Sequence, residues 1–301
     1  MMNSLWSKLR GQSLATKLLQ ASLKQGRIAP GYLFAGPSGV GKALAARLFA
    51  AELLETTHRF QRIEEGNHPD LLWIEPTYKK GNQLFTRTQA PAEGISLRSM
   101  PQVRLEQVRA VAHTLSRPPV EAPRQVVVVE GAETMAEASA NGFLKTLEEP
   151  GHAVIILLVP DIHHVLSTIV SRCQRIPFYR LSDALLLEIL EYSSCPPEIL
   201  AMAQGSVGQA QELLQGLESM PPMLLEDLKS WPTDPIQALT LARTIDKHLD
   251  HSQQLWLVDY LQQNAWKQGH TQVLTTLEQV RFQLGRFIPP RLVWEVALLK
   301  Q

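Results

Sequence analysis

Residues 36–42 read Gly-Pro-Ser-Gly-Val-Gly-Lys, a G-x-x-x-x-G-K stretch that decides the fold expected for this chain. An apolar run at 32–35 precedes it, and a helix-like apolar pattern at 44–51 follows it. A glycine loop between a strand and a helix presents backbone N–H groups to phosphate oxygens, and the lysine and helix N-terminus add positive charge. The stretch predicts a phosphate-binding loop. Its candidate binding residues are Gly36, Gly39, Gly41 and Lys42.

The hydrolytic parts that usually accompany such a loop are incomplete. Ala43 stands where a hydroxyl would help to hold Mg²⁺ on a bound nucleotide. An ATPase also needs an acidic pair at the end of a core strand, and here Glu130 is followed by Gly131. Glu133 is displaced and is interpreted as a surface residue. The sequence therefore predicts no intrinsic ATPase activity and no required cofactor, while passive nucleotide binding stays open.

The composition is that of an ordinary globular protein, with 301 residues, 45% hydrophobic and 19% charged. The formal net charge of zero gives no overall attraction to nucleic acid or anionic membranes. Only Cys173 and Cys195 occur, too few for a four-cysteine zinc site, so no zinc is expected. The apolar run at 153–159 is far shorter than a membrane span of ~20 residues, and 1–10 has no signal-peptide core. We expect a soluble cytoplasmic protein without a metal.

The first part of the chain alternates strand and helix patterns. Apolar runs at 71–74, 126–129 and 152–159 predict strands, and apolar residues at helical spacing predict helices between them. Such alternation favours a parallel sheet covered by helices on both faces, which we expect to close near Phe178. The polar stretch from Thr77 to Pro101 is interpreted as a long surface loop or a hairpin. Beyond Tyr179, helix-like segments punctuated by proline and glycine take over.

Ser171-Arg172-Cys173 follows a helix-like turn and is expected just past the last core strand. Arg172 is either a surface ion-pair residue or an arginine that stabilises phosphate in a neighbouring subunit, and spacing alone favours the surface. Cys173 has no base partner in the sequence and is interpreted as a small buried hydrophobe. His163 and His164 lack further ligands at suitable spacing and are expected to be solvated.

Four motifs, in the order in which they occur, resemble the clamp-loader branch of the AAA+ proteins. They are the loop 36–42, His68-Pro69-Asp70, the run Asn-Gly-Phe-Leu-Lys-Thr-Leu-Glu-Glu-Pro at 141–150, and Ser171-Arg172-Cys173. The Leu-Lys-Thr-Leu-Glu-Glu-Pro run and the Ser-Arg-Cys triplet are together specific to that branch, whereas the loop alone is not. The likeness is dense over 11–178 and architectural beyond, and it is greatest to the non-hydrolysing subunits of bacterial DNA polymerase III.

The resemblance implies an AAA+ core domain at 1–178, a small helical lid domain at 179–218 and a helical collar (oligomerisation) domain at 219–301. The implied partners are the clamp-loader ATPase subunits, the delta subunit, the sliding clamp and, through the complex, primed DNA, with no membrane. For Arg172 the resemblance implies the role of an arginine finger acting in trans, which reverses the weighting from spacing alone.

Where the chain departs from the family, it departs toward the non-hydrolysing subunits. Ala43 and Gly131 match those subunits, and 205–208 has glycine where active relatives carry a lid arginine. Many relatives also carry a four-cysteine zinc module, but no cysteine lies between Lys42 and His68. The resulting prediction is a stator-like clamp-loader subunit within the DNA polymerase III holoenzyme.

Two rival interpretations stay open at this stage. A self-sufficient AAA+ ATPase, such as a divergent motor subunit, would need Glu130 and water to replace the missing groups, and Ala43 with Gly131 argues against it. A free-standing DNA-binding module is disfavoured because the net charge is zero and there is no basic helix or aromatic stacking platform.

Overall fold

The computed structural model describes residues 3–81, 83–90, 92–95, 100–191, 195–228, 231–286 and 288–300. The chain divides into two compact units, Met1–Leu181 and Ser182–Gln301, and each is described by itself. The expected division into domains at 178/179 and 218/219 stays a prediction.

The first unit is built on a five-stranded parallel sheet in the order β2-β5-β6-β1-β7. Its strands are β1 (Gly31–Ala35), β2 (Leu71–Ile74), β5 (Gln125–Glu130), β6 (Ala153–Val159) and β7 (Gln174–Pro177). In the register of the three inner strands, Val127 lies opposite Ile155, which lies opposite Gly31. The sheet confirms the α/β fold class with a parallel core that the glycine loop and the alternating pattern predicted.

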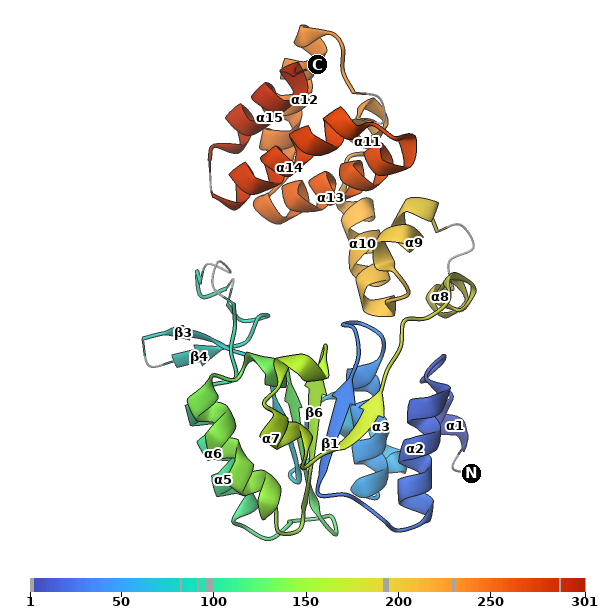
Figure 1. Cartoon of the computed structure of the whole chain (residues 1–301), viewed down its shortest axis with the longest axis vertical. Helices are drawn as coiled ribbons and strands as arrows, with labels where there is room; N and C mark the ends of the chain where they lie inside the picture. The colour runs from blue at the N-terminus through green and yellow to red at the C-terminus, as the bar shows by residue number, and fades with distance from the viewer. Residues whose placement is uncertain are drawn as a thin grey trace. The chain divides into compact units, whose positions relative to one another are not determined.

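Along the inner strands, side chains alternate between two apolar cores, one on each face of the sheet. Val126 and Val128 of β5 face the helices α2 (Ser13–Lys24) and α3 (Lys42–Leu53), together with α4 (Phe60–Glu64). Val127 and Val129 face α5 (Leu105–Leu115), α6 (Glu137–Glu148) and α7 (Ser167–Val170) on the other side. Figure 1 shows these two groups of helices on opposite faces of the sheet. Burial on both faces explains why β5 and β6 read as continuous apolar runs.

Two features of this unit differ from the expectation or refine it. The Ser-Arg-Cys triplet does not lie past the last strand, because β7 follows it and pairs with β1 at the sheet edge. Within the stretch from Thr77 to Pro101, β3 (Tyr78–Lys80) and β4 (Gln83–Phe85) form an antiparallel hairpin, so the hairpin alternative is confirmed there. Residues 82, 91 and 96–99 of this stretch lie outside the described residues.

Asp70, from the His-Pro-Asp motif, ties the loop before β5 to the start of β2. Its carboxylate accepts hydrogen bonds from the backbone N–H groups of Val120, Glu121 and Ala122 at 2.6, 2.8 and 2.9 Å. Burial by itself would raise the pKa of this carboxyl, but the three N–H donors outweigh it and hold the pKa below its ordinary value. The motif therefore has a structural role, placing β5 and the acidic residue at its end.

Replacing Asp70 by Asn is expected to destabilise the first unit by about 2–4 kcal/mol, because an amide offers one acceptor oxygen to three backbone N–H donors. Hydrogen exchange of the β5 amides reports this unit alone. Because the folded-state pKa is lowered, the Asp70 contribution is present above the unfolded pKa near ~4 and is lost as the pH falls below it. The gap from wild type should therefore shrink in acid. Asp161→Asn, which alters one exposed turn bond to His163, is the control and should change little.

The second unit is helical throughout its described residues. Its elements are α8 (Asp183–Leu190), α9 (Pro197–Ala203), α10 (Val207–Ser219), α11 (Pro222–Asp227), α12 (Pro235–His248), α13 (His251–Gln268), α14 (Thr271–Gly285) and α15 (Pro290–Leu299). One apolar cluster joins α8, α9 and α10, and a larger one joins α11 to α15. At 205–208, Ser206 caps α10 by accepting a hydrogen bond from the Gln209 N–H at 3.1 Å. The expected helical region is thus confirmed.

Candidate phosphate loop and exposed arginine

The glycine loop runs from the end of β1 to the start of α3, where the sequence placed it. A Cβ atom at Gly36 would lie 2.3 Å from the carbonyl oxygen of Phe178, so the loop can pass that backbone only as glycine. Gly41 has a left-handed φ of 103° and forms the N-cap of α3. On the outer side of the loop, the Gln12 amide donates to the carbonyl of Val40 at 3.1 Å. The predicted residues therefore gather in one loop, and phosphate binding by it stays a prediction.

Lys42 is turned back onto the loop itself. Its ammonium group donates hydrogen bonds to the carbonyl oxygens of Gly36 and Pro37, the second at 2.6 Å. Burial lowers the pKa of Lys42 to about 8, while the charges of Glu133 and Glu130 oppose that shift. Lys42 is therefore mostly protonated at neutral pH, and two of its three N–H groups are bonded to carbonyl groups of its own loop.

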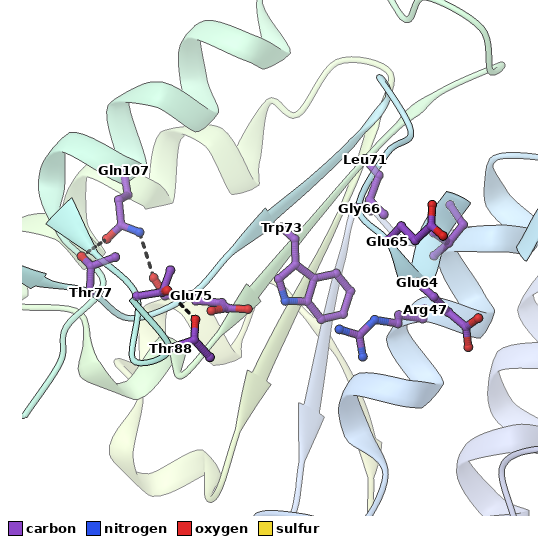
Figure 2. A pocket seen from close by; sticks show the side chains of 12 residues that line it. Arg47, Glu64, Glu65, Gly66, Leu71, Trp73, Glu75, Thr77, Thr88 and Gln107 are labelled. Atoms are coloured by element: carbon purple, nitrogen blue, oxygen red, sulfur yellow. Dashed lines mark hydrogen bonds between the residues drawn. The ribbon is translucent and has the colours of Figure 1, made fainter. Parts of the chain in front are cut away.

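The remaining strand-end carboxylate, Glu130, is held by the neighbouring strand. The Trp73 Nε1–H donates to Glu130 Oε1 at 2.9 Å. Burial, followed by the charge of Glu75, raises the pKa of Glu130. Figure 2 shows Trp73 in an open pocket with the Arg47 guanidinium beside its ring, 4.5 Å from the ring centroid. This pocket of about 430 Å³ lies along the free edge of β2. Glu130 is thus one member of a Trp-Arg-Glu cluster.

Gly131 leaves no room for the carboxylate that a hydrolytic site needs. Its φ is +58°, and a Cβ atom there would lie 2.6 Å from Cγ of Pro76. A residue with a side chain would be strained in its backbone and would also collide with the proline ring. The absence of an acid at this position is therefore built into the local packing, which the sequence alone did not indicate.

Glu133 is not the surface residue that the sequence suggested. Glu133 lies in the short turn Ala132–Thr134, which follows the left-handed Gly131. Its Oε2 atom is buried and has no hydrogen-bond partner within the described residues. Burial raises the pKa of this carboxyl, against the lowering charges of Lys42 and His164. The charges of Glu133 and Lys42 therefore interact, which couples Glu133, three positions beyond Glu130, to the phosphate loop.

Arg172 forms a surface ion pair with its own chain. Its Nε donates to Glu148 Oε1 at 2.8 Å, and a terminal nitrogen donates to the Thr168 carbonyl at 2.9 Å. The side chains of Arg172 and Glu148 are 37% and 49% exposed. Next to it, burial raises the pKa of Cys173 to about 11, and its Sγ would lie 3.1 Å from a Cβ at Gly31. Cys173 is thus a packing residue, partly buried rather than the fully buried hydrophobe that the sequence suggested.

Two properties of the described residues bear on the other expectations. No group of three or more His, Cys, Asp or Glu side chains among them is placed to hold a metal ion. Across this same part of the chain, no helix combines the length and the apolarity needed to cross a membrane. His163 and His164 are exposed in a short turn.

Comparison with known proteins places both units of the chain. The family described as DNA polymerase III, delta subunit matches residues 11–182. The family described as cyanobacterial DNA polymerase III delta prime, C-terminal domain matches residues 181–301. The two matches meet at the boundary between the units.

Two delta' relatives agree with these matches. The DNA polymerase III subunit delta' of Bacillus subtilis is 30% identical over 67% of this chain, which spans 59% of that protein. The delta' subunit of Pseudomonas aeruginosa is 29% identical over 80% of this chain and 69% of its own length. A DNA polymerase III gamma-subunit-related structure from Thermotoga maritima aligns over 95% of this chain and 97% of its own, with 16% identity and a TM-score of 0.49. The chain therefore belongs to the family of DNA polymerase III delta-prime subunits.

Proposed function

We propose that this chain is a non-hydrolysing, stator-like subunit of a replicative clamp loader. In this role it assembles with ATPase subunits of the tau/gamma type and with the delta subunit. Together they open a sliding clamp and place it on primed DNA. Arg172 acts on ATP that a neighbouring ATPase subunit holds. The likeness to the tau subunit of Bacillus subtilis supports this proposal. That subunit is 27% identical over 68% of this chain, and the chain spans 36% of it.

The observation that carries this proposal is the contact between Gly131 and Pro76. A hydrolytic site needs a carboxylate after Glu130, and a side chain at 131 would be strained in its left-handed backbone and would collide with the proline ring. Ala43 removes the metal-holding hydroxyl independently, and it packs against the apolar core instead. Lys42 is meanwhile bonded to its own loop. Gly131 affects water activation, Ala43 affects metal binding and Lys42 affects the contact with phosphate. Because these are different steps, the three features support the same conclusion separately.

The isolated chain is expected to show no ATP turnover above background. A coupled phosphate-release assay with MgATP measures this, and the Lys42→Ala variant serves as the background. Steady turnover that disappears in Lys42→Ala would contradict the proposal. Nucleotide binding without turnover would leave it intact, because the loop itself is present.

One observation favours the alternative of a self-sufficient ATPase. Glu133 Oε2 is buried without a hydrogen-bond partner within the described residues, and its charge acts on Lys42. In this alternative, that carboxylate would activate the attacking water. If turnover were found, Glu133→Gln should abolish it, whereas Glu65→Gln, at an exposed position on the same unit, should not.

A further inference from the structure

The N–H groups of the Arg172 guanidinium fall into two sets, those hydrogen-bonded to the chain itself and those left over. Arginine carries five N–H groups, one on Nε and two on each terminal nitrogen. Glu148 Oε1 accepts from Nε and from one terminal nitrogen, and the Thr168 carbonyl accepts from the other terminal nitrogen. These bonds use three of the five N–H groups. One N–H therefore remains on each of the two terminal nitrogens, and arginine can bind a phosphate in a two-point contact through N–H groups of this kind.

We propose that Glu148 is the positioning residue for Arg172. It holds Nε and one terminal nitrogen, so that the two remaining terminal N–H groups are presented to a neighbour's nucleotide. This inference rests on the proposed function of Arg172. It assigns a role to the first glutamate of the Glu-Glu-Pro run, and none to the second, Glu149.

Glu148 is poorly explained as a stabiliser of the fold. It is the last residue of α6, where a negative charge interacts unfavourably with the helix dipole. Its ion pair with Arg172 is half exposed, and such pairs contribute only ~0–1 kcal/mol to stability. The ion pair is better explained by its effect on the orientation of the Arg172 side chain. A free arginine side chain has many rotamers, and anchors on α6 and α7 together hold this one in a single orientation before any nucleotide is met.

The test uses reconstituted clamp-loader complexes and the rate of DNA-stimulated MgATP hydrolysis. Glu148→Gln keeps the size and an acceptor oxygen but loses the charge that holds the guanidinium. It is expected to lower turnover at the neighbouring site by about 10-fold through kcat, with KM nearly unchanged, because the guanidinium is misplaced in the transition state. Glu149→Gln, one residue further along, is the matched control and should have no effect. The thermal midpoint of the chain should be the same in all three proteins.

A double variant separates positioning from any independent role. In the Arg172→Ala background, Glu148→Gln should cause no further loss, because there is no guanidinium left to hold. An equal loss in both backgrounds, an unchanged rate, or a faster rate in Glu148→Gln alone would each overturn the inference. If Arg172→Ala lowers the rate and Glu148→Gln does not, only the positioning role fails. If Arg172→Ala has no effect, the proposed function of Arg172 fails, and the inference with it.

Discussion

Replacing Arg172 by alanine in the assembled clamp loader is expected to slow DNA-stimulated ATP turnover and clamp loading, while the chain stays folded and assembled. A supplied arginine finger is worth ~10³ to 10⁵ in rate at the site that it serves. In the proposed complex with several ATP sites, the total rate should fall by less, because only the site beside this subunit is affected. Folding should be spared because the side chain is a partly exposed surface group. Steady-state ATPase and clamp-loading assays measure both effects.

Two further variants make the Arg172 result specific. Arg172→Lys should rescue poorly, because an ammonium keeps the charge but cannot make the two parallel hydrogen bonds of a guanidinium. Arg175, exposed on β7, is the matched control, and Arg175→Ala should leave both rates unchanged. Unchanged rates with Arg172→Ala would return the residue to the role of a surface ion pair, and failure to assemble would show that it is structural.

Restoring the missing acid by Gly131→Glu is expected to destabilise the first unit by about 2–4 kcal/mol and to restore no hydrolysis. The Cβ atom would have to displace the Pro76 ring, and the left-handed backbone would be strained as well. Adding Ala43→Thr supplies the hydroxyl but does not relieve the contact. Hydrogen exchange of β5 and an ATPase assay of the double variant measure the two outcomes.

The chain offers a close control for the Gly131 contact. Gly151 has nearly the same φ, +62°, but a Cβ there has nothing within 4 Å. Gly151→Ala should therefore show the backbone strain alone, and Gly131→Ala should be the more damaging of the two. The difference should vanish when Pro76 is also replaced by alanine. A stable Gly131→Glu protein that hydrolyses ATP would show that the site is closed by one residue only.

The sequence predicted the parts of the fold that are buried on both sides. The run at 126–129 is entirely apolar and became an inner strand, since only a fully buried strand tolerates such a run. β7 escaped prediction because it is an edge strand in which Ile176 alone is fully buried. The helix α15 lies within the proline-punctuated region in which helices were expected. It begins after Pro289 with Pro290 in its first turn, where proline suits a helix start although it otherwise signals a break.

At the candidate site, sequence supplied residue types but not their partners. The loop 36–42 is contiguous, so its gathering in space follows from the sequence. The contacts that decide its chemistry join distant positions, as with Gly131 and Pro76 or with Trp73 and Glu130. The pairing of Arg172 with Glu148 spans 24 positions in the same way. No periodicity or spacing rule encodes such contacts, because they depend on how β2, β5 and α6 are packed.

The proline beside Gly131 also bears on descent. In a lineage that carries both residues, one substitution cannot place a working acid at position 131, because its side chain would collide with the Pro76 ring. Pro76 has to change first, and that change alone confers no activity on which selection could act. In the proposed non-hydrolysing role, the close approach of Pro76 to Gly131 therefore adds a barrier of its own to the return of hydrolysis, besides the missing hydroxyl at Ala43.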